Sequence, residues 1–548
     1  MFFSMAWDIR NGCRLGIKSS DISTSGIHPT NQPRHCFMSS PNALYSVAEI
    51  RTIEQAALAA LPPFTLMQRA GQAAANRALE LVGSPPHLAR ILVLAGPGNN
   101  GGDALEAAGC LAQQGASVTV LLYADAGRRP DDARLAYDHV RNSAAQFAEP
   151  ANSDQVITSS PWSLVIDGLF GIGLKRGISA PLRGVIEQIN NLDCRALALD
   201  IPSGLDADTG NIVGAEGIAI RATDTITFIG NKPGLHTGHG RDYAGRVQVS
   251  DLDIGSEFFV AAKAHLNQPE LFSESMRPRP HNSHKGSFGD LIVVGGARGM
   301  SGAAVLAARA AAKCGAGRVF AAFLADPPAY DCMQPELMCR LAQEMNFAST
   351  AVTIGPGLGN ADVAQEMLAR ALLADAPLVI DADALNLIAS QGDLRQKLHD
   401  RAHPALLTPH PLEAARLLNT SAAQVQADRL AAARQLAAEL NCVVLLKGSG
   451  SVIAQKSGEL VVNTTGNPAL ATAGTGDVLA GICGALLAQG WRAWHAALAG
   501  CWLHGAAADT LVSQGVGPIG MTASELIPCV RTLLNRLTAE HAHQSTSK

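Results

Sequence analysis

The sequence feature that most constrains the fold is the alternation of short apolar runs with longer, Ala-rich segments of helical periodicity. The run Ile91–Leu94 is followed by a Gly-rich loop, an apolar segment from about Asp103 to Gln114 and a second run, Ser117–Tyr123. Continuous apolar runs of this length are typical of strands buried on both faces of a parallel sheet. A helix between two such strands completes a βαβ unit, so we expect an α/β fold.

The same alternation continues through both halves of the chain. In the first half, helices are expected near Val47–Ala60 and Leu66–Leu81, and further strands at Leu164–Ile166, Ala196–Leu199, Thr225–Ile229 and Val247–Val249. In the second half, strands are expected at Leu291–Val294, Arg318–Phe323, Val352–Ile354, Leu378–Ile380, Leu406–Thr408 and Val443–Leu446. The two halves do not repeat each other at a fixed spacing, so they are expected to be different domains.

A chain of 548 residues is too long for one ordinary hydrophobic core. Residues 1–43 lack periodicity and are rich in Ser, Asn and Pro, which predicts a disordered tail, and Met38 is an alternative start. The stretch 263–284 is polar and contains Pro, as interdomain connections usually do. We therefore expect one domain over 44–262 and a second over 285–541.

Composition narrows the class of protein. The formal net charge of -5 offers no basic field that would attract a nucleic acid. The 11 cysteines form no C-x-x-C pair, which excludes a zinc-finger pattern and favours reduced thiols in the cytoplasm. No segment has the length and apolarity of a membrane span or a secretion signal, so a cytoplasmic enzyme without a membrane partner is expected.

Polar loops follow three of the strands expected in the first half. They are GPGNNGGD (Gly96–Asp103), DGLFGIGLKRG (Asp167–Gly177) and DIPSGLDADTG (Asp200–Gly210). Because ligands of parallel sheets bind at the carboxyl ends of the strands, we expect these loops to converge on one crevice. Their Asp, Asn and Ser side chains supply oxygen ligands suited to an alkali or alkaline-earth cation. Read one at a time, however, each loop could simply be a tight turn.

The first of these loops also satisfies the dinucleotide pattern G-x-G-x-x-G through Gly96, Gly98 and Gly101, with Asp125 after the next strand. An oxidoreductase is therefore an alternative. Against it, Asp103 would oppose a pyrophosphate at the start of the helix, and the loop has Pro and Asn where close backbone approach is needed. The pattern alone makes this the weaker interpretation.

The three loops, quoted as AGPGNNGGDALEAA, GLFGIGLKRG and LDIPSGLDADTG, closely resemble those of NAD(P)H-hydrate epimerases over about residues 45–262. The resemblance implies a Rossmann-like three-layer domain that acts on nicotinamide cofactors damaged by addition of water. It implies a potassium ion on Asn100, Asp167 and Ser203. It also implies a hydrate site made by Asn99, Asn100, Gly101, Gly102, Asp103, Gly171, Ile172, Gly173, Leu174, Lys175, Arg176, Gly177 and Asp200.

Epimerisation through an iminium needs an acid/base group, for which Asp200 is the candidate. Lys175 either steadies a phosphate or the departing hydroxyl, or is a solvated surface lysine. Ala104 departs from the family pattern, which generally has Gly there. That departure could tighten the loop or weaken the activity.

The second half contains no G-x-x-x-x-G-K-[ST] phosphate loop. Instead, a Gly-rich turn at Gly474, Thr475, Gly476 and Asp477 precedes a strongly apolar helix. Free backbone N–H groups and the helix dipole at such a turn suit a phosphoryl group, although Asp477 could equally be a plain helix cap.

The motifs HKGSFGDLIVVGG, IGPGLG, DADALN, LTPHPLEAARL, LLKGSGS and GNPALATAGTGDVLAG resemble, in this order, the ribokinase-like ADP-dependent NAD(P)H-hydrate dehydratases over about 281–540. The resemblance implies nucleotide contacts at Lys447, Gly448, Ser449, Gly450, Ser451, Gly474, Thr475 and Gly476. It implies hydrate contacts at Ala303, Gly357, Gly359, His410 and Asp477, of which His410 could instead only fix a turn. NPAL replaces the family's commoner NPGM and leaves the anion loop unchanged.

Within this resemblance, Asp477 deprotonates the ring hydroxyl, the nucleotide's terminal phosphoryl moves to that oxygen with Mg²⁺ present, and phosphate then leaves. ADP is favoured over ATP because bacterial members of the family commonly use it. Together the halves resemble bifunctional NAD(P)H-hydrate repair enzymes, with the hydrates NADHX and NADPHX as substrates and a homo-oligomer expected. The alternative is a ribokinase-like vitamin-precursor kinase with an N-terminal ligand-binding module.

Overall fold

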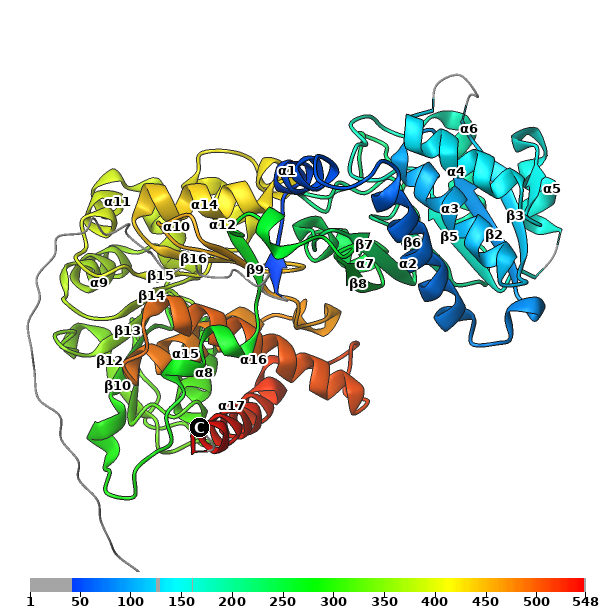
Figure 1. The fold of residues 1–548 in the computed structure, drawn as a ribbon. Coiled ribbons are helices and arrows are strands. Elements are labelled where there is room, and N and C mark those ends of the chain that lie inside the picture. Colours follow the sequence, from blue (N-terminus) through cyan, green and yellow to red (C-terminus); the bar gives the residue numbers. More distant parts are fainter. Residues whose placement is uncertain (1–41, 125–128, 160, 547–548) are drawn as a thin grey trace, which may run out of the picture.

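The computed structural model describes residues 42–124, 129–159 and 161–546, in which two sheets organise two domains (Figure 1). The expected tail, the alternative start Met38 and Asp125 therefore lie outside the described residues, apart from the tail's last residues. Both sheets are covered by helices on their two faces, as parallel sheets require. The expected α/β class is confirmed.

The first sheet is entirely parallel, with the strand order β4-β3-β2-β5-β6-β7-β8. Its strands are β2 (Arg90–Ala95), β3 (Ser117–Leu122), β4 (Gln146–Ala148), β5 (Leu164–Gly168), β6 (Ala196–Leu199), β7 (Asp224–Phe228) and β8 (Arg246–Ser250). All strands expected in this half are present, and the short β4 is an addition. The order reverses direction between β2 and β5, and such a switch point opens a crevice for a ligand.

Helices cover the first sheet on both faces. They are α1 (Val47–Leu58), α2 (Thr65–Val82), α3 (Asn99–Gln113), α4 (Asp131–Arg141), α5 (Ser153–Thr158), α6 (Ala180–Asn190) and α7 (Gly240–Tyr243). Ile91 and Val93 of β2 pack with α2, α3 and α4, whereas Leu92 and Leu94 pack on the opposite face with α5 and α6. The alternation produces three layers, as the Rossmann-like expectation required.

The helix expected from about Asp103 begins one turn earlier, at Asn99. Its first turn contains Gly101 and Gly102, whose low helix propensity predicts a later start. Glycine is nevertheless needed in this turn, because a Cβ at Gly101 would lie 1.9 Å from the carbonyl oxygen of Gly96. The close approach folds the loop and the first turn into one unit at the edge of the sheet.

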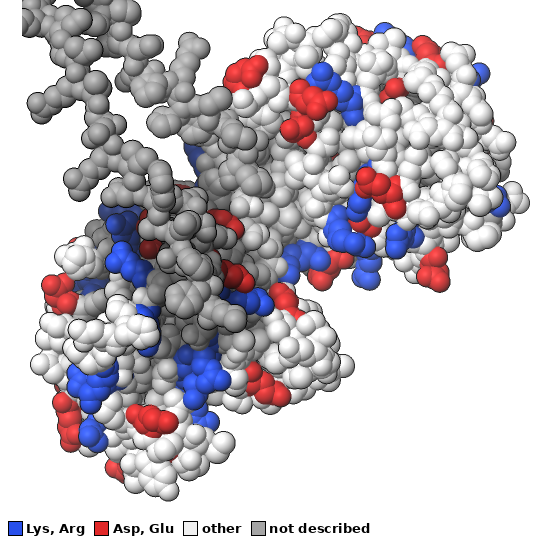
Figure 2. All heavy atoms as spheres, turned by 60° about the horizontal axis from the view of Figure 1, so that its bottom comes forward, with Lys and Arg blue, Asp and Glu red and all other residues white. Residues whose placement is uncertain are grey.

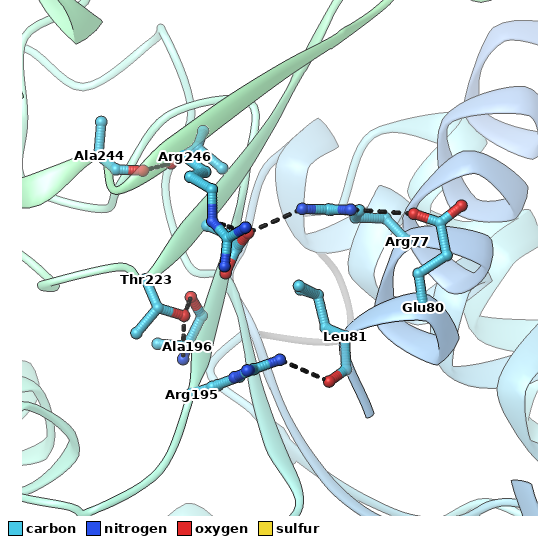
Figure 3. A network of polar contacts seen from close by, with 10 residues as sticks. Arg77, Glu80, Leu81, Arg195, Ala196, Thr223, Ala244 and Arg246 are labelled. Atoms are coloured by element: carbon cyan, nitrogen blue, oxygen red, sulfur yellow. Dashed lines mark hydrogen bonds and ion pairs between the residues drawn. The ribbon is translucent and has the colours of Figure 1, made fainter. Parts of the chain in front are cut away.

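Helix α2 is attached to the sheet by a buried ion pair (Figure 3). Arg77 donates to Asp224 at the start of β7 over 2.8 Å, and also to Glu80 in its own helix over 2.9 Å. Arg195 reaches the carbonyl oxygen of Leu81 at 2.8 Å. Asp224 is only 1% exposed, so its charge is compensated mainly by Arg77.

The second sheet has the strand order β1-β9-β18-β17-β16-β15-β14-β13-β10-β11-β12. Its strands are β1 (Ala43–Leu44), β9 (Ala264–Leu266), β10 (Asp290–Gly295), β11 (Arg318–Phe323), β12 (Met338–Leu341), β13 (Ala351–Ile354), β14 (Leu378–Ile380), β15 (Leu406–Leu407), β16 (Val443–Leu446), β17 (Val452–Ala454) and β18 (Leu460–Val462). The strands from β16 to β12 are parallel, and β16, β17 and β18 form an antiparallel meander.

Two helical layers enclose this sheet. On one face lie α8 (Ser301–Lys313), α15 (Thr475–Ala488), α16 (Ala493–Ser513) and α17 (Ala523–Thr546). On the other lie α9 (Asp362–Leu373), α10 (Ala382–Ser390), α11 (Gly392–His399), α12 (Pro411–Leu417), α13 (Ala422–Ala427) and α14 (Arg429–Leu440). The domain has a three-layer α/β architecture, as was expected.

The segment 263–284, expected to be a connection, is partly built into the second sheet. Strand β9 pairs with both β18 and β1, and Phe272 and Met276 are buried in the core beneath α16 and α17. Every residue from Arg277 to Ser287 is exposed, whereas earlier exposed positions alternate with buried ones. The first domain is therefore inserted between two strands of the second sheet. The polar composition of the segment concealed this, because β9 contributes only three residues.

Charge is not segregated on the face shown in Figure 2, where Lys and Arg side chains lie among Asp and Glu side chains. The nine cysteines in the described ranges are all free thiols. Of the helices that the structure describes, none has both the length and the apolarity needed to cross a bilayer.

Candidate active sites

A cavity of about 700 Å³ opens at the carboxyl edge of the first sheet. The loops expected to converge do converge there. The cavity is lined by Asn99, Asn100, Asp103, Gly171, Ile172, Gly173, Leu174, Lys175, Arg176 and Asp200. The expected residues Gly101, Gly102 and Gly177 do not line it. A Cβ at Gly101 would meet Gly96 of the same loop, and a Cβ at Gly102 would meet Met67 of α2.

Beside the cavity, Asp167 and Ser203 form a buried pair. The Ser203 hydroxyl donates to Asp167 over 2.6 Å, and the Ser203 N–H donates to the other carboxylate oxygen over 2.8 Å. Burial raises the pKa of Asp167 to about 6, although these bonds and one from the Leu169 N–H work in the opposite direction. An uncompensated carboxyl group of this kind suits a bound cation.

Asn100 is the third residue expected to bind the cation. Its side chain is 7% exposed, and neither its amide oxygen nor its amide nitrogen has a hydrogen-bond partner. A Cβ added at Gly171 would lie 3.4 Å from Asn100 and 3.0 Å from the Asp200 carboxylate, so Gly171 separates the two side chains. Buried amides are normally paired, and an orphaned one indicates a missing ligand.

Asp200 lines the cavity from a strained backbone position with a φ of 65°. Its carboxylate accepts from Lys232 over 2.6 Å and from the Ile172 N–H over 3.3 Å. The Lys232 side chain is 0% exposed and also donates to Thr227 and to the carbonyl oxygen of Phe228. Sequence reasoning missed Lys232, although it follows the strand β7 just as the chosen loops follow theirs.

Two more carboxyl groups face the cavity. Burial, and then the neighbouring charge of Asp200, raise the pKa of Asp103 well above its usual range. The same two causes raise the pKa of Glu54 on α1. The cavity thus combines a lysine-paired carboxylate with carboxyl groups that hold their protons to higher pH, which is a usable acid/base arrangement. Glu54 was not expected from the sequence, because it lies on a helix far from the strand ends.

Ala104, the departure from the family pattern, is fully buried and packs against Gly168. A Cβ at Gly168 would lie 2.4 Å from the Ala104 methyl group. The methyl group therefore points into the helix–sheet contact.

The second site lies at the start of α15. Gly474 has a φ of 89° and precedes the first turn, in which the Thr475 N–H donates to Thr472 whereas the N–H groups of Gly476 and Asp477 have no acceptor among the described residues. A Cβ at Gly476 would be 3.4 Å from the Lys447 ammonium group, so Lys447 lies directly against this turn. The Gly-rich turn and the loop after β16 are thus brought together, as the sequence predicted.

Charged groups surround this turn. Lys447 donates to Asp381 over 2.8 Å. Burial alone would lower the pKa of Lys447, but the negative charges of Asp381 and Glu413 outweigh burial and raise this pKa. Burial, and then Asp381, raise the pKa of Asp477 to about 6, while Lys447 acts in the opposite direction. A carboxyl group with this pKa is matched to proton transfer near neutral pH.

The other residues expected at the hydrate site come together at the ends of β10 and β13. A Cβ at Gly357 would lie 3.3 Å from Ala303. Gly359 donates its N–H to Asp383 over 2.8 Å. Both glycines have positive φ angles, 58° and 71°, so a side chain would be strained at either position.

His410 caps α12 with its own ring. Its Nδ1 accepts from the Leu412 N–H at 3.1 Å and from the Glu413 N–H at 3.4 Å. The turn-fixing interpretation is therefore observed. Burial and the positive charge of Lys447 lower the pKa of His410. The ring is also partly exposed beside Lys447, which leaves a ligand role open to test.

Two family models match the sequence of this chain. Residues 291–531 match the model described as NAD(P)H-hydrate dehydratase, and residues 63–234 match the one described as YjeF-related protein N-terminus. The chain is thus a two-domain α/β enzyme whose second half matches the NAD(P)H-hydrate dehydratases.

Full-length relatives identify the family. The chain is 37% identical over 509 residues to the bifunctional NAD(P)H-hydrate repair enzyme Nnr of Coxiella burnetii, with 90% of this chain and 99% of the relative covered. It is 35% identical over 520 residues to that of Escherichia coli, with 93% and 97% covered. The chain belongs to the bifunctional NAD(P)H-hydrate repair enzymes, which combine an epimerase with a dehydratase, so neither an oxidoreductase nor a vitamin-precursor kinase is supported.

Among solved structures, the ADP/ATP-dependent NAD(P)H-hydrate dehydratase from Bacillus subtilis, co-crystallised with ATP and Mg²⁺, is 28% identical. It covers 50% of this chain and 98% of its own, with a TM-score of 0.43.

Proposed function

We propose that the first cavity interconverts the R and S hydrates of NADH and NADPH, and that the second site dehydrates the S hydrate at the expense of ADP. The observation that carries this proposal is the pairing of a Gly-rich turn that has free N–H groups with Lys447 and Asp477 at the start of α15. Phosphoryl transfer needs such a turn, a cation and a base close together.

In the first cavity, Asp200 exchanges protons with the ring hydroxyl. Protonation lets the hydroxyl leave as water while the ring nitrogen's lone pair forms an iminium. Water then adds to the other face and returns its proton to the carboxylate. Lys232 supports this role because its ammonium group fixes one oxygen of Asp200 at 2.6 Å. Asp103 is a second carboxyl group that can supply or hold the proton.

A potassium ion fits the corner made by Asn100, Asp167 and Ser203. The supporting observations are the buried Asn100 amide without a partner and the buried Asp167 carboxyl group. Oxygen ligands from an amide, a carboxylate and a hydroxyl suit a hard cation of low charge. Such an ion would supply fixed positive charge beside the cavity.

At the second site, Asp477 takes the proton of the ring hydroxyl and the hydroxyl oxygen attacks the terminal phosphorus of the nucleotide. With ADP as donor, AMP is released. The new C–O–P link then breaks at carbon, phosphate leaves, and loss of a ring proton restores the dihydronicotinamide. The free N–H groups of Gly476 and Asp477 and the Lys447 ammonium group beside Gly476 support this step, because they would stabilise the charge of the transferring phosphoryl group.

Mg²⁺ would be held mainly by the nucleotide phosphates. In the part of the chain that the structure describes, no group of three or more His, Cys, Asp or Glu could cage a metal. Magnesium commonly binds through phosphates and one or two carboxylates. Asp381 and Asp383 fit that role, because both are close enough to Asp477 to raise its pKa.

The test is a repair assay with chemically hydrated NADH, ADP and Mg²⁺, followed by the return of dihydronicotinamide absorbance. Recovery of both epimers is expected. Rapid recovery of only the S form would leave the first cavity without the proposed activity. A stable phosphate ester without recovered absorbance would instead indicate a kinase, and no consumption of ADP would overturn the second assignment.

A further inference from the structure

A segment of the first domain lies directly behind the nucleotide-binding loop of the second. The Thr237 hydroxyl, in a residue that is 0% exposed, donates to the carbonyl oxygens of Ser449 at 3.1 Å and Gly450 at 3.0 Å. The Gly238 N–H donates to the same Ser449 carbonyl at 3.1 Å. The Ser449 hydroxyl in turn donates to Gly238 at 3.0 Å.

The two backbones are in contact with no side chain between them. A Cβ at Gly450 would lie 2.0 Å from the carbonyl oxygen of His236 and 2.6 Å from the Thr237 Cα. Gly450 also has a φ of 61°, which only glycine adopts without strain. The loop therefore cannot retreat towards the first domain.

This contact sets the direction of the loop's amides. In a trans peptide, the C=O of one residue and the N–H of the next point in opposite directions. Hydrogen bonding of the Ser449 and Gly450 carbonyls to Thr237 therefore turns the N–H groups of Gly450 and Ser451 away from the first domain. The hydrogen bonds of the described residues include none donated by either N–H, so both are available to a phosphate or ribose.

Thr237 is itself held by Arg429 at the start of α14. The guanidinium group, in a residue 2% exposed, donates to the Thr237 hydroxyl at 3.3 Å. It also donates to the carbonyl oxygens of Leu446 and Lys447, each at 3.3 Å. One buried hydroxyl thus accepts from the second domain and donates to its nucleotide loop.

The segment that carries Thr237 is anchored in the first cavity. Five residues earlier, Lys232 donates to Asp200. His236 contacts the Asn231 side chain at 2.8 Å, and the His239 N–H donates to Gly210 at 3.0 Å. The backbone on both sides of Thr237 is therefore held by contacts within the first domain, in addition to the bonds that Thr237 makes to the second.

We propose that Thr237 of the epimerase domain is a positioning residue for the dehydratase reaction. It acts through Ser449 and Gly450, whose carbonyls it orients so that the loop Lys447–Ser451 presents its amides to the nucleotide. This inference rests on the proposed binding of ADP at that loop. It assigns part of the dehydratase machinery to the other domain.

Two substitutions in the full-length chain test it. Thr237→Val keeps the shape of the side chain but leaves the buried Gly450 carbonyl without its donor and removes one of the two donors to the Ser449 carbonyl, whereas Thr237→Ser keeps the hydroxyl. We expect Thr237→Val to raise the KM for ADP about tenfold and to change kcat less than about twofold, with epimerase rates unchanged. Thr237→Ser should restore the KM to near the wild-type value.

Asn211→Ala is the matched control. Asn211 donates across the same domain border to the carbonyls of Gln426 and Ala427, at 3.1 Å and 2.8 Å, without touching the nucleotide loop. Its KM for ADP should equal that of the wild type. An equal rise in KM for Asn211→Ala, or for Thr237→Ser, would show that general loosening of the domain border is responsible and would overturn the proposal.

A measurement on the wild-type protein tests the proposal even if the variants do not fold. Mg²⁺–ADP should slow hydrogen exchange both in peptides containing 448–451 and in peptides containing 236–240. Protection of 448–451 alone would contradict the positioning role. If ADP protects neither segment and is not consumed by the wild type, the proposed function of the site fails instead.

Discussion

Asp477 illustrates how a single side chain acquires its chemistry from its surroundings. Its carboxyl group lies in the first turn of α15, where the helix dipole favours the charged form. Burial and the nearby Asp381 carboxylate oppose this and raise its pKa to about 6. The result is a base that is charged at neutral pH and still accepts a proton readily.

The pH dependence of dehydration follows from this pKa. Asp477 must be deprotonated to accept the hydroxyl proton, so the rate is expected to be flat above about pH 7. It should fall about tenfold per pH unit below about pH 6. The measurement is kcat at saturating ADP between about pH 5 and 8.

The control is Asp477→Asn, which cannot accept the proton and should abolish dehydration at every pH while ADP still binds in equilibrium dialysis. Normal turnover by this variant would remove Asp477 as the base.

Epimerisation in the first cavity is expected to depend on potassium. Asn100→Ala removes one oxygen ligand from the corner that Asp167 and Ser203 share. Epimerisation should fall at least about tenfold, and dialysis into potassium-free buffer should produce a similar loss in the wild type. The dehydration rate of the S hydrate in the same sample is the internal control. Epimerisation that persists unchanged without potassium would contradict the assignment.

Elements dock through specific contacts as well as through apolar packing, and α2 is the clearest case. Its apolar face packs on the first sheet, but Arg77 also has to meet the buried Asp224 of β7 (Figure 3). Arg246 lies 3.8 Å from Asp224 but is largely exposed, so it compensates the charge only weakly.

Arg77→Met is therefore expected to destabilise the first domain by about 3 kcal/mol, because it leaves the Asp224 carboxylate buried without a close partner. The measurement is the urea midpoint of that domain's unfolding transition. Glu80→Ala is the matched control: it removes the exposed partner of the same arginine and should cost less than about 0.5 kcal/mol. Equal effects of the two substitutions would contradict the assigned role of the buried pair.

At the scale of the whole molecule, the first domain is an insertion in the second sheet (Figure 1). The chain enters through β1 and returns through β9, and these strands pair with each other. Both connections are short, which holds the Thr237 segment against the nucleotide loop. The two sites lie on different sheets but are linked through the contact between Thr237 and the loop Lys447–Ser451.

The position of the true boundary is testable with two fragments. A fragment 263–548 keeps β9 and the buried Phe272 and Met276, whereas a fragment 285–548 loses them. Loss of two large core side chains and a strand should cost more than about 4 kcal/mol. Thermal or urea unfolding of the two fragments measures the difference. Equal stability would show that β9 and the residues after it are only a connection.

Local sequence patterns were sufficient for most of the architecture. Runs such as Ile91–Leu94 and Val443–Leu446 are strands because their residues are apolar at every position, and that information lies within a few residues. The Gly-rich turn at Gly474–Asp477 was predictable for the same reason. Loops that follow parallel strands must meet at one edge, so the gathering of Asn100 and Asp200 followed as well.

Contacts between residues far apart in the chain could not be predicted from local sequence patterns. Thr237 and Ser449 are separated by 212 positions, and nothing near either residue encodes their contact. Lys232 acquires a role only because β7 brings it to Asp200, and β9 is a strand only because β18 and β1 provide partners. The sequence determined which segments are strands, helices and ligand loops, since those preferences are local. The contact between Thr237 and the loop Lys447–Ser451 was decided by packing, since hydrogen bonds between distant segments form only when the whole chain has folded.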